Sequence, residues 1–361
     1  MKKILCLILC FVMACSLLIS CSKSEIGDYL KNYPEQTETV GKLALNMYII
    51  VGDNTTENAK TTVKRMISQH TVSDYNTELN VFYVSESEYE TTVMSAINNG
   101  GENAPHIILI NSESMLNSLY KSDADTKLAD LTAYYASRDY GKLNTQIATS
   151  LLQSSKLGES NKLYTVPNNH VVDEYTYLVI DEDVAHQTLH YPSNELNAYK
   201  SLEDAAELKN KMALAGYNAD ELVYEISGPY ELKAELEAAG NFCNIIKYPT
   251  ATATEVFSSA FAIVNTEAKY NDRAMQMIYA INTDVYLRNL LQYGVMGTNY
   301  NVVDGDIVRI SEGENVYNMN LKYTGDIFRA EFCSELNWTK AAYDNGISQN
   351  KDSVAAEKNT D

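Results

Sequence analysis

The sequence predicts an α/β protein with two lobes, and three observations indicate this. The chain of 361 residues is long enough for two domains. Apolar runs typical of strands alternate with amphipathic segments typical of helices. This alternation also occurs in two successive sets. With 45% hydrophobic and 21% charged residues, the composition is that of a globular protein. Strands that alternate with helices predict sheets covered by helices on both faces.

The first set begins with a buried strand over 45–51, followed by Gly52 to Thr56, which supply turn and N-cap residues for a helix toward His70. Period-2 alternation and apolar runs predict the other strands at 78–84, 106–110, 162–167, 175–180, 222–226, 242–248 and 257–264. Apolar residues at helical spacing predict helices over 89–97, 202–214, 230–239 and 272–293.

The N-terminus predicts export and lipid attachment. Lys2 and Lys3 precede an apolar run over 4–19 that is too short to span a bilayer comfortably and is typical of a secretory signal. The run closes on Leu-Ile-Ser-Cys, which resembles a bacterial lipobox, so Cys21 is the predicted site of lipid attachment, including palmitate. The alternative is an ordinary signal peptide with an incidental cysteine. We expect a protein held at the extracytoplasmic face of the cell membrane by its lipid.

The net charge argues against two classes of partner. A formal net charge of -20 argues against binding to nucleic acid or to an anionic membrane surface. We expect a monomer.

Of six cysteines, Cys243 and Cys333 alone lie beyond the signal and the lipobox. In an extracytoplasmic compartment this pair could form a disulfide, or the two thiols could be free and buried.

Several stretches, in order along the chain, resemble extracellular solute-binding proteins of ABC importers, typified by maltose- and oligosaccharide-binding proteins. The similar stretches are Lys162 to Pro167, Tyr175 to Asp181, Ser227 to Tyr230, Ile245 to Pro249, Phe261 to Ile263, Asn271 to Ala274 and Leu290 to Tyr300. This resemblance implies a periplasmic-binding-protein fold of type II: two lobes, each a mixed or parallel sheet flanked by helices, with a hinge between them. Between Leu189 and Leu222 the chain is shorter than in the family, which implies a shortened second lobe.

The residues and the resemblance together imply a division of the chain, and the resemblance implies a function. The expected parts are a signal peptide (1–20), a polar tether (21–42), a first lobe (43–167 and 256–300), a second lobe (168–255 and 301–350) and a disordered tail (351–361). The implied function is capture of a small polar ligand, a sugar or oligosaccharide, by hinge closure, for delivery to an ABC importer permease.

The sequence contains no motif that predicts a catalytic site or a metal site. Of five histidines, only His186 and His190 stand at i and i+4, and the glutamate of a His-Glu-x-x-His zinc site is glutamine here. No nucleophile elbow or Walker loop is present. We therefore expect no catalytic residues, no metal and no cofactor. Two rival interpretations stay open: a secreted surface hydrolase and a surface interaction lipoprotein without transport.

Candidate ligand contacts follow from strand ends and from aromatic residues. Ligands of open α/β sheets lie beyond the carboxyl ends of strands. The polar residues that follow strands are Asp53, Asn54, Asn111, Ser112, Asn168 and Asn169, each also suited to turns or caps. Among 27 tyrosines, Tyr230 stands where the resemblance places an aromatic platform. The single tryptophan, Trp338, is either a second cleft ring or a core ring.

Replacement of Cys21 by alanine tests the predicted anchor. Because the acceptor thiol is lost, Cys21→Ala should accumulate as unprocessed precursor or be released to the medium. Metabolic labelling with palmitate reports the outcome. A variant that still incorporates the label would contradict lipidation at this residue.

Overall fold

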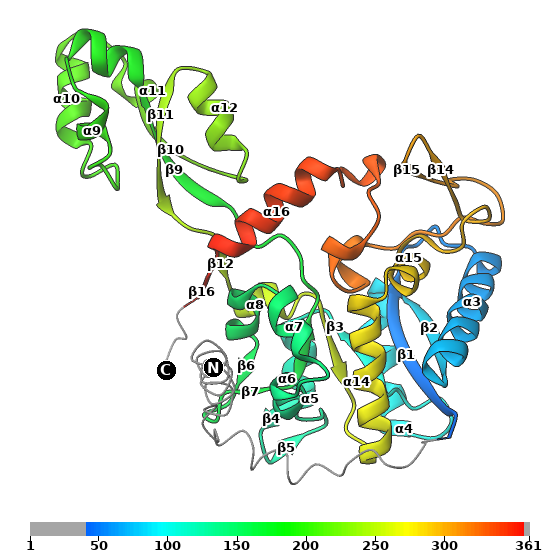
Figure 1. Cartoon of the computed structure of the whole chain (residues 1–361). Helices are drawn as coiled ribbons and strands as arrows, with labels where there is room; N and C mark the ends of the chain where they lie inside the picture. Colours follow the sequence, from blue (N-terminus) through cyan, green and yellow to red (C-terminus); the bar gives the residue numbers. More distant parts are fainter. Residues whose placement is uncertain (1–40, 357–361) are drawn as a thin grey trace, which may run out of the picture. The chain divides into compact units, whose positions relative to one another are not determined.

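The computed structural model describes residues 41–356, whose two larger sheets, of five and of three strands, have separate hydrophobic cores (Figure 1). The predicted two-lobed α/β architecture is confirmed. The predicted lipid-attachment residue, Cys21, lies outside the described residues.

The first lobe is built on a five-stranded mixed sheet. Its order is β2 (Thr77–Ser85), β1 (Leu43–Val51), β3 (Ile107–Ile110), β13 (Ala260–Ile263) and β8 (Thr165–Pro167). The first three of these strands are parallel, and β13 runs antiparallel to both of its neighbours. From Leu45 to Val51 every residue of β1 is buried, as expected for a strand covered on both faces.

Helices pack on this sheet and on one another, and the sequence predicts all of them except the short helix at 113–119. They are α3 (Glu57–Tyr75), α4 (Tyr89–Asn99), α5 (Glu113–Leu119), α14 (Ala268–Thr283) and α15 (Val285–Tyr293). The segment predicted as one helix over 272–293 is two, because Asp284 interrupts it and caps α15 by accepting from the backbone of Tyr286 and Leu287. Asp284 also lies 2.6 Å from His70 Nε2, which fixes α15 against α3.

Short elements connect β3 to β8. They are β4 (Tyr120–Ser122), β5 (Asp125–Thr126), α6 (Thr132–Ala136), α7 (Gly141–Gln146), α8 (Thr149–Ser154), β6 (Lys156–Leu157) and β7 (Lys162–Leu163). Asp123, in the β4–β5 turn, accepts hydrogen bonds from the hydroxyls of Tyr120 (2.8 Å) and Tyr164 (3.0 Å). These bonds join the β4–β5 hairpin to Tyr164, which lies between β7 and β8.

The second lobe is small and its sheet is antiparallel. Its central strand, β9 (Tyr175–Asp181), lies between β10 (Val223–Gly228) and β11 (Asn241–Lys247). The accompanying helical elements are a π-helical turn (Val184–Thr188), α9 (Ser193–Leu196), α10 (Ala206–Leu214), α11 (Ala219–Leu222) and α12 (Leu232–Ala238). A parallel or mixed sheet was expected here. The β10–α12–β11 unit does place its strands parallel, but β9 lies between them and runs against both.

The C-terminal segment departs from the predicted division of the chain. It contains a hairpin of β14 (Tyr300–Val303) and β15 (Asp306–Arg309), 3-10 turns at 321–323, 327–329 and 334–336, α16 (Lys340–Asp352) and β16 (Val354–Ala355). Tyr317, Met319 and Tyr323 lie in the core of the five-stranded sheet, although residues 301–350 were expected in the second lobe. Sequence order could not indicate this, because the part that carries these side chains, residues 310–336, lacks a strand or helix period.

The last described residues are ordered by pairing, whereas a disordered tail was expected over 351–361. Within this range α16 continues to Asp352, and β16 pairs in parallel with β12 (Thr250–Ala251), which precedes α13 (Ala253–Val256). Residues 357–361 lie outside the described part of the chain.

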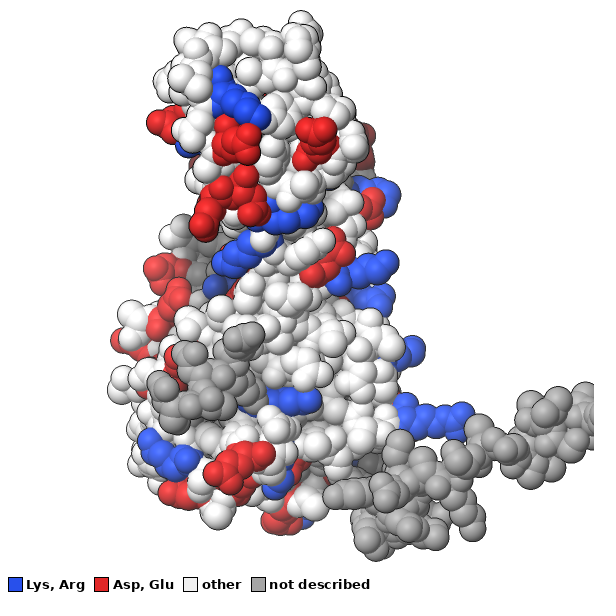
Figure 2. Space-filling view, turned by 90° about the vertical axis from the view of Figure 1, so that its left-hand side faces the viewer, with Lys and Arg blue, Asp and Glu red and all other residues white. Residues whose placement is uncertain are grey.

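Charges of both signs are interspersed on the face that Figure 2 presents, so the net charge of -20 does not form one continuous acidic surface there. Within residues 41–356, no helix is both long enough and apolar enough to cross a membrane.

The two described cysteines are free and lie in different cores. Cys243 packs in β11 against Tyr175, Tyr177 and Val179 of the second lobe. Cys333 packs with Tyr293 and other residues beside the first lobe. The disulfide considered from the sequence is therefore not formed, because the C-terminal segment that carries Cys333 does not belong to the second lobe. Burial raises the pKa of the Cys243 thiol to about 11, which keeps it protonated and unreactive.

Thiol counting tests this arrangement. Denatured, unreduced mature protein should expose two reactive thiols, those of Cys243 and Cys333, to an aromatic disulfide reagent. The native protein should react slowly at both, since both are buried. A denatured protein without reactive thiols would contradict the separation of the two cores.

Candidate ligand-binding site

A pocket of about 480 Å³ lies at the carboxyl ends of β1 and β2. Its walls are residues 50–53 at the end of β1, Glu86 just after β2, residues 318–321 with Tyr323, and Leu336. All of these residues lie outside the second lobe. The pocket stands at the edge of the sheet where ligands of α/β proteins bind, and its lining mixes apolar side chains with a few polar ones, as small-molecule sites do.

The backbone at the end of β1 approaches the C-terminal segment closely. Gly52 N donates to Asn318 O at 2.9 Å, and a Cβ at this position would lie 2.8 Å from the same oxygen. Thr55 completes the contact, because its hydroxyl donates to Asn318 O and accepts from Asn318 N. Glycine is therefore needed at position 52 for the C-terminal segment to form one wall of the pocket.

The polar groups of the pocket are mostly acceptors. Glu86 accepts a hydrogen bond from the Tyr323 hydroxyl at 2.7 Å, and burial together with this carboxylate raises the pKa of Tyr323. Asn318 Oδ1 accepts from Arg309 at 2.8 Å, and that guanidinium also pairs with Glu335 at 3.2 Å. Asp53 lines the pocket and, like Glu86, is exposed.

The other predicted residues at the ends of β1 and β3 have separate places. Asn54 lies in the exposed turn after β1. Ser112 caps α5 by accepting from Met115 N at 3.0 Å. Asn111 Oδ1 is buried, and no group in the described part of the chain donates to it. Of the candidates near these strands, Asp53 alone among the described residues lines the pocket.

Asn168 and Asn169 hold the chain where it leaves the five-stranded sheet. Asn168 Nδ2 donates to Ser259 Oγ and to Lys322 O, both at 3.0 Å. Asn169 Nδ2 donates to Gln146 O at 2.8 Å and to Asp326 Oδ1 at 3.1 Å. Both asparagines are buried, and their hydrogen bonds hold the start of the crossover to the second lobe in place.

Helix α16 supplies hydrogen-bond partners for the rest of this crossover, residues 168–174. Gln349 Nε2 donates to Val172 O (2.6 Å) and to Asp173 O. Asn350 accepts from Val172 N (2.9 Å) and donates to His170 O (2.7 Å). Each bond contributes about 1 kcal/mol, and more would be lost if a buried backbone group had no partner. Two adjacent amide side chains thus fix the path between the lobes.

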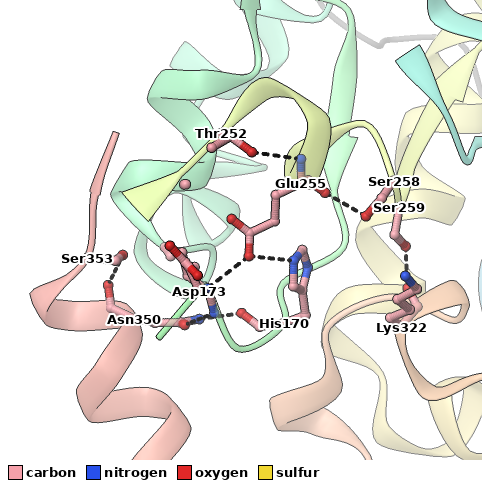
Figure 3. Close-up of polar contacts among 12 residues, drawn as sticks. His170, Asp173, Thr252, Glu255, Ser258, Ser259, Lys322, Asn350 and Ser353 are labelled. Carbon is pink, nitrogen blue, oxygen red and sulfur yellow. Dashed lines mark hydrogen bonds and ion pairs between the residues drawn. The ribbon is translucent and has the colours of Figure 1, made fainter. Parts of the chain in front are cut away.

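Figure 3 shows that His170 and Glu255 point toward one another beside this crossover. Their side chains approach to 3.6 Å, and Glu255 also accepts from Asp173 N at 3.0 Å. His170 Nδ1 donates to Asn168 O at 2.7 Å. Because Glu255 follows the return crossover at 248–249, this cluster joins the two connections between the lobes.

Tyr230 and Trp338 have different surroundings. Tyr230 follows β10 and is 42% exposed, and its backbone N donates to Gln349 Oε1 at 3.0 Å. Tyr248, at the end of β11, is 48% exposed, and both rings pack near Tyr175. Trp338 is a core ring, 5% exposed and packed against Phe328 and Tyr343. Its alternative placement in the cleft is not observed.

A second pocket, of about 430 Å³, lies between α16, the segment before α8 and residues 326–329. Asn169 lines it, as does Asp326, which is 2% exposed. Burial raises the pKa of Asp326 to about 6, because loss of solvent outweighs its hydrogen bonds and the attraction of Arg288 and Arg329. Among the described residues, no group of three or more potential ligands could hold a metal ion.

Sequence reasoning missed most of the main pocket. Glu86 follows β2 and could have been found by the rule that selected Asp53. Asn318, Asn320 and Tyr323 lie in an irregular segment far along the chain, and no local pattern connects them with the ends of β1 and β2.

No protein-family model matches the chain, and no curated protein matches it. Solved structures do. The N-glycan transport solute binding protein NgtS from Streptococcus pneumoniae aligns with a TM-score of 0.54 at 14% identity, over 87% of this chain and 84% of that one. Its complex with Man5GlcNAc gives 0.53 at 15% identity, over 87% and 83%. Its complex with Man1GlcNAc gives 0.52 at 14%, over 87% and 84%.

The chain has the fold of extracellular solute-binding proteins. The fold expected from the sequence resemblance is thereby confirmed. Because a fold hosts many functions, the function has to be argued from the pocket and the hinge.

Replacement of Asp326 by asparagine tests the buried carboxyl group. The folded protein holds this proton up to about pH 6, whereas the ordinary value is 3.8, so ionisation of Asp326 lowers stability as pH rises through this window. Asparagine keeps the accepting oxygen without the charge. Denaturant unfolding should show Asp326→Asn gaining on the wild type by roughly 1–3 kcal/mol between pH 4 and pH 7. A difference that is constant with pH would contradict the assignment.

Proposed function

We propose that the protein is a membrane-anchored extracellular solute-binding protein that captures a small polar ligand, a carbohydrate, for import. The observation that carries the proposal is the pocket of about 480 Å³ at the carboxyl edge of the first-lobe sheet, in a chain with the fold of solute-binding proteins. Solved structures with this fold include complexes of NgtS with Man5GlcNAc and Man1GlcNAc.

Capture proceeds by hinge closure. The second lobe, residues 175–247, is joined to the first through the crossovers at 168–174 and 248–249. Rotation about these two short segments lets the second lobe cover a ligand bound at the sheet edge. A ligand that contacts both lobes binds the closed state more tightly and shifts the population toward it.

The exposed tyrosines of the second lobe are the proposed contacts from the opposite side. Tyr230 and Tyr248 stand at the hinge end of the three-stranded sheet, each about half exposed, and both are supported by Tyr175. A tyrosine ring offers a flat apolar face together with a hydroxyl, which suits the faces of sugar rings. Asp53 and Glu86 supply hydrogen-bond acceptors from the first lobe.

Attachment and delivery complete the proposal. The predicted lipid on Cys21 would hold the protein at the extracytoplasmic face of the cell membrane, close to its importer. The closed, loaded form would then be presented to an ABC importer permease. The rival hydrolase would release products from an oligosaccharide, and the rival interaction protein would show no ligand-dependent closure.

Distance measurement between the lobes tests capture and closure together. In the full-length protein in detergent, spin labels on Gln69→Cys in α3 and Leu214→Cys in α10 report the separation of the lobes, since both positions are exposed. A panel of neutral oligosaccharides that includes mannose and N-acetylglucosamine units is added, and calorimetry identifies the binder.

We expect the binder to shorten the distance and to be recovered intact. Labels placed at Gln69→Cys and Arg65→Cys, both in α3, should report no change and serve as the control. Recovery of cleaved oligosaccharide would favour the hydrolase. Binding without a change in the distance between the lobes would contradict hinge closure.

A further inference from the structure

The pocket at the ends of β1 and β2 is acidic. Asp53 and Glu86 both line it, and none of its described lining residues is a lysine, arginine or histidine. Within residues 41–356, neither carboxylate forms an ion pair with a basic side chain. Glu86 has one protein donor in this part of the chain, the neutral hydroxyl of Tyr323. The two carboxylates therefore face the pocket with their charge uncompensated by its walls.

The charged side chains next to the lining residues do not neutralise the two carboxylates. Arg309 reaches Asn318, but its charge is shared with Glu335 at 3.2 Å. The ammonium of Lys322 lies over the Tyr323 ring, 5.5 Å from its centroid. These two cations and one acid, added to the two carboxylates of the lining, leave an excess of negative charge around the pocket.

We infer that the pocket selects saccharides by charge: an amino sugar with a free ammonium group binds most tightly, its neutral hydroxyl counterpart less tightly, and a uronic acid least. The inference rests on the proposed capture of a carbohydrate and specifies the class of ligand. An ammonium group donates charge-assisted hydrogen bonds to carboxylates, which are about twice as strong as neutral ones. A uronate would bring a third carboxylate beside two that already lack a counter-ion, and such like-charge contacts oppose binding.

The test uses three β1,4-linked disaccharides that differ in one kind of substituent: the glucosamine dimer, cellobiose and cellobiouronic acid. Each is titrated by calorimetry into the full-length protein in detergent at pH 6.5, where the amine is protonated and the acids are ionised. We expect the glucosamine dimer to bind roughly fivefold or more tightly than cellobiose, and the acid to bind more weakly by a similar factor. Added salt should compress both ratios.

Two double variants test whether the carboxylates of the pocket cause the order of affinities for the three disaccharides. Asp53→Asn with Glu86→Gln removes both charges and keeps the accepting oxygens, and it should bring the three affinities to within about twofold. Asp125→Asn with Glu159→Gln makes the same change of net charge on the exposed β4–β5 and β6–β7 hairpins, and it should leave the ranking unaltered.

The outcomes separate this inference from the proposed function. Equal or tighter binding of the uronic acid by the wild type overturns the charge selection and leaves carbohydrate capture standing. A ranking that survives Asp53→Asn with Glu86→Gln also overturns it, because the selection then arises elsewhere. Failure of all three disaccharides and of the wider neutral panel overturns carbohydrate capture, and the charge ranking with it.

Discussion

The arrangement of the two lobes depends on how the backbone of residues 168–174 is hydrogen-bonded. This segment leaves a sheet without strand partners of its own and is buried at Asn168, Asn169 and Val172, so its N–H and C=O groups need other partners. Gln349 and Asn350 of α16 provide them for residues 170, 172 and 173. The C-terminal helix is thus part of the hinge, although it lies nearly at the end of the chain.

The C-terminal segment also shapes the pocket by a related constraint. Residues 316–318 lie along the loop after β1, where Gly52 and Thr55 bind the backbone of Asn318. Buried Arg288 then holds the continuation of this segment by donating to the carbonyls of Leu321 and Asp326. The segment that closes the pocket therefore leads directly to the helix that fixes the crossover.

The sequence predicts the regular elements well because their patterns are local. The buried run of β1 and the amphipathic spacing of α3 lie where periodicity places them, and Asp53 follows from the rule for strand ends. Irregular segments are different, since residues 310–336 carry no period and their position is set by contacts with distant residues. Of the two alternatives for the cysteines, the disulfide is not formed for this reason, because it required Cys333 to belong to the second lobe.

Hydrogen exchange tests most directly that the ligand binds at the carboxyl edge of the first-lobe sheet. Backbone amide exchange, followed by mass spectrometry, is compared for the full-length protein with and without a saturating saccharide. The account predicts slower exchange in the peptides that carry residues 50–53, 86 and 318–323, which form the pocket, and in the crossover at 168–174. Protection confined to other surfaces, with the exchange of these peptides unchanged, would contradict it.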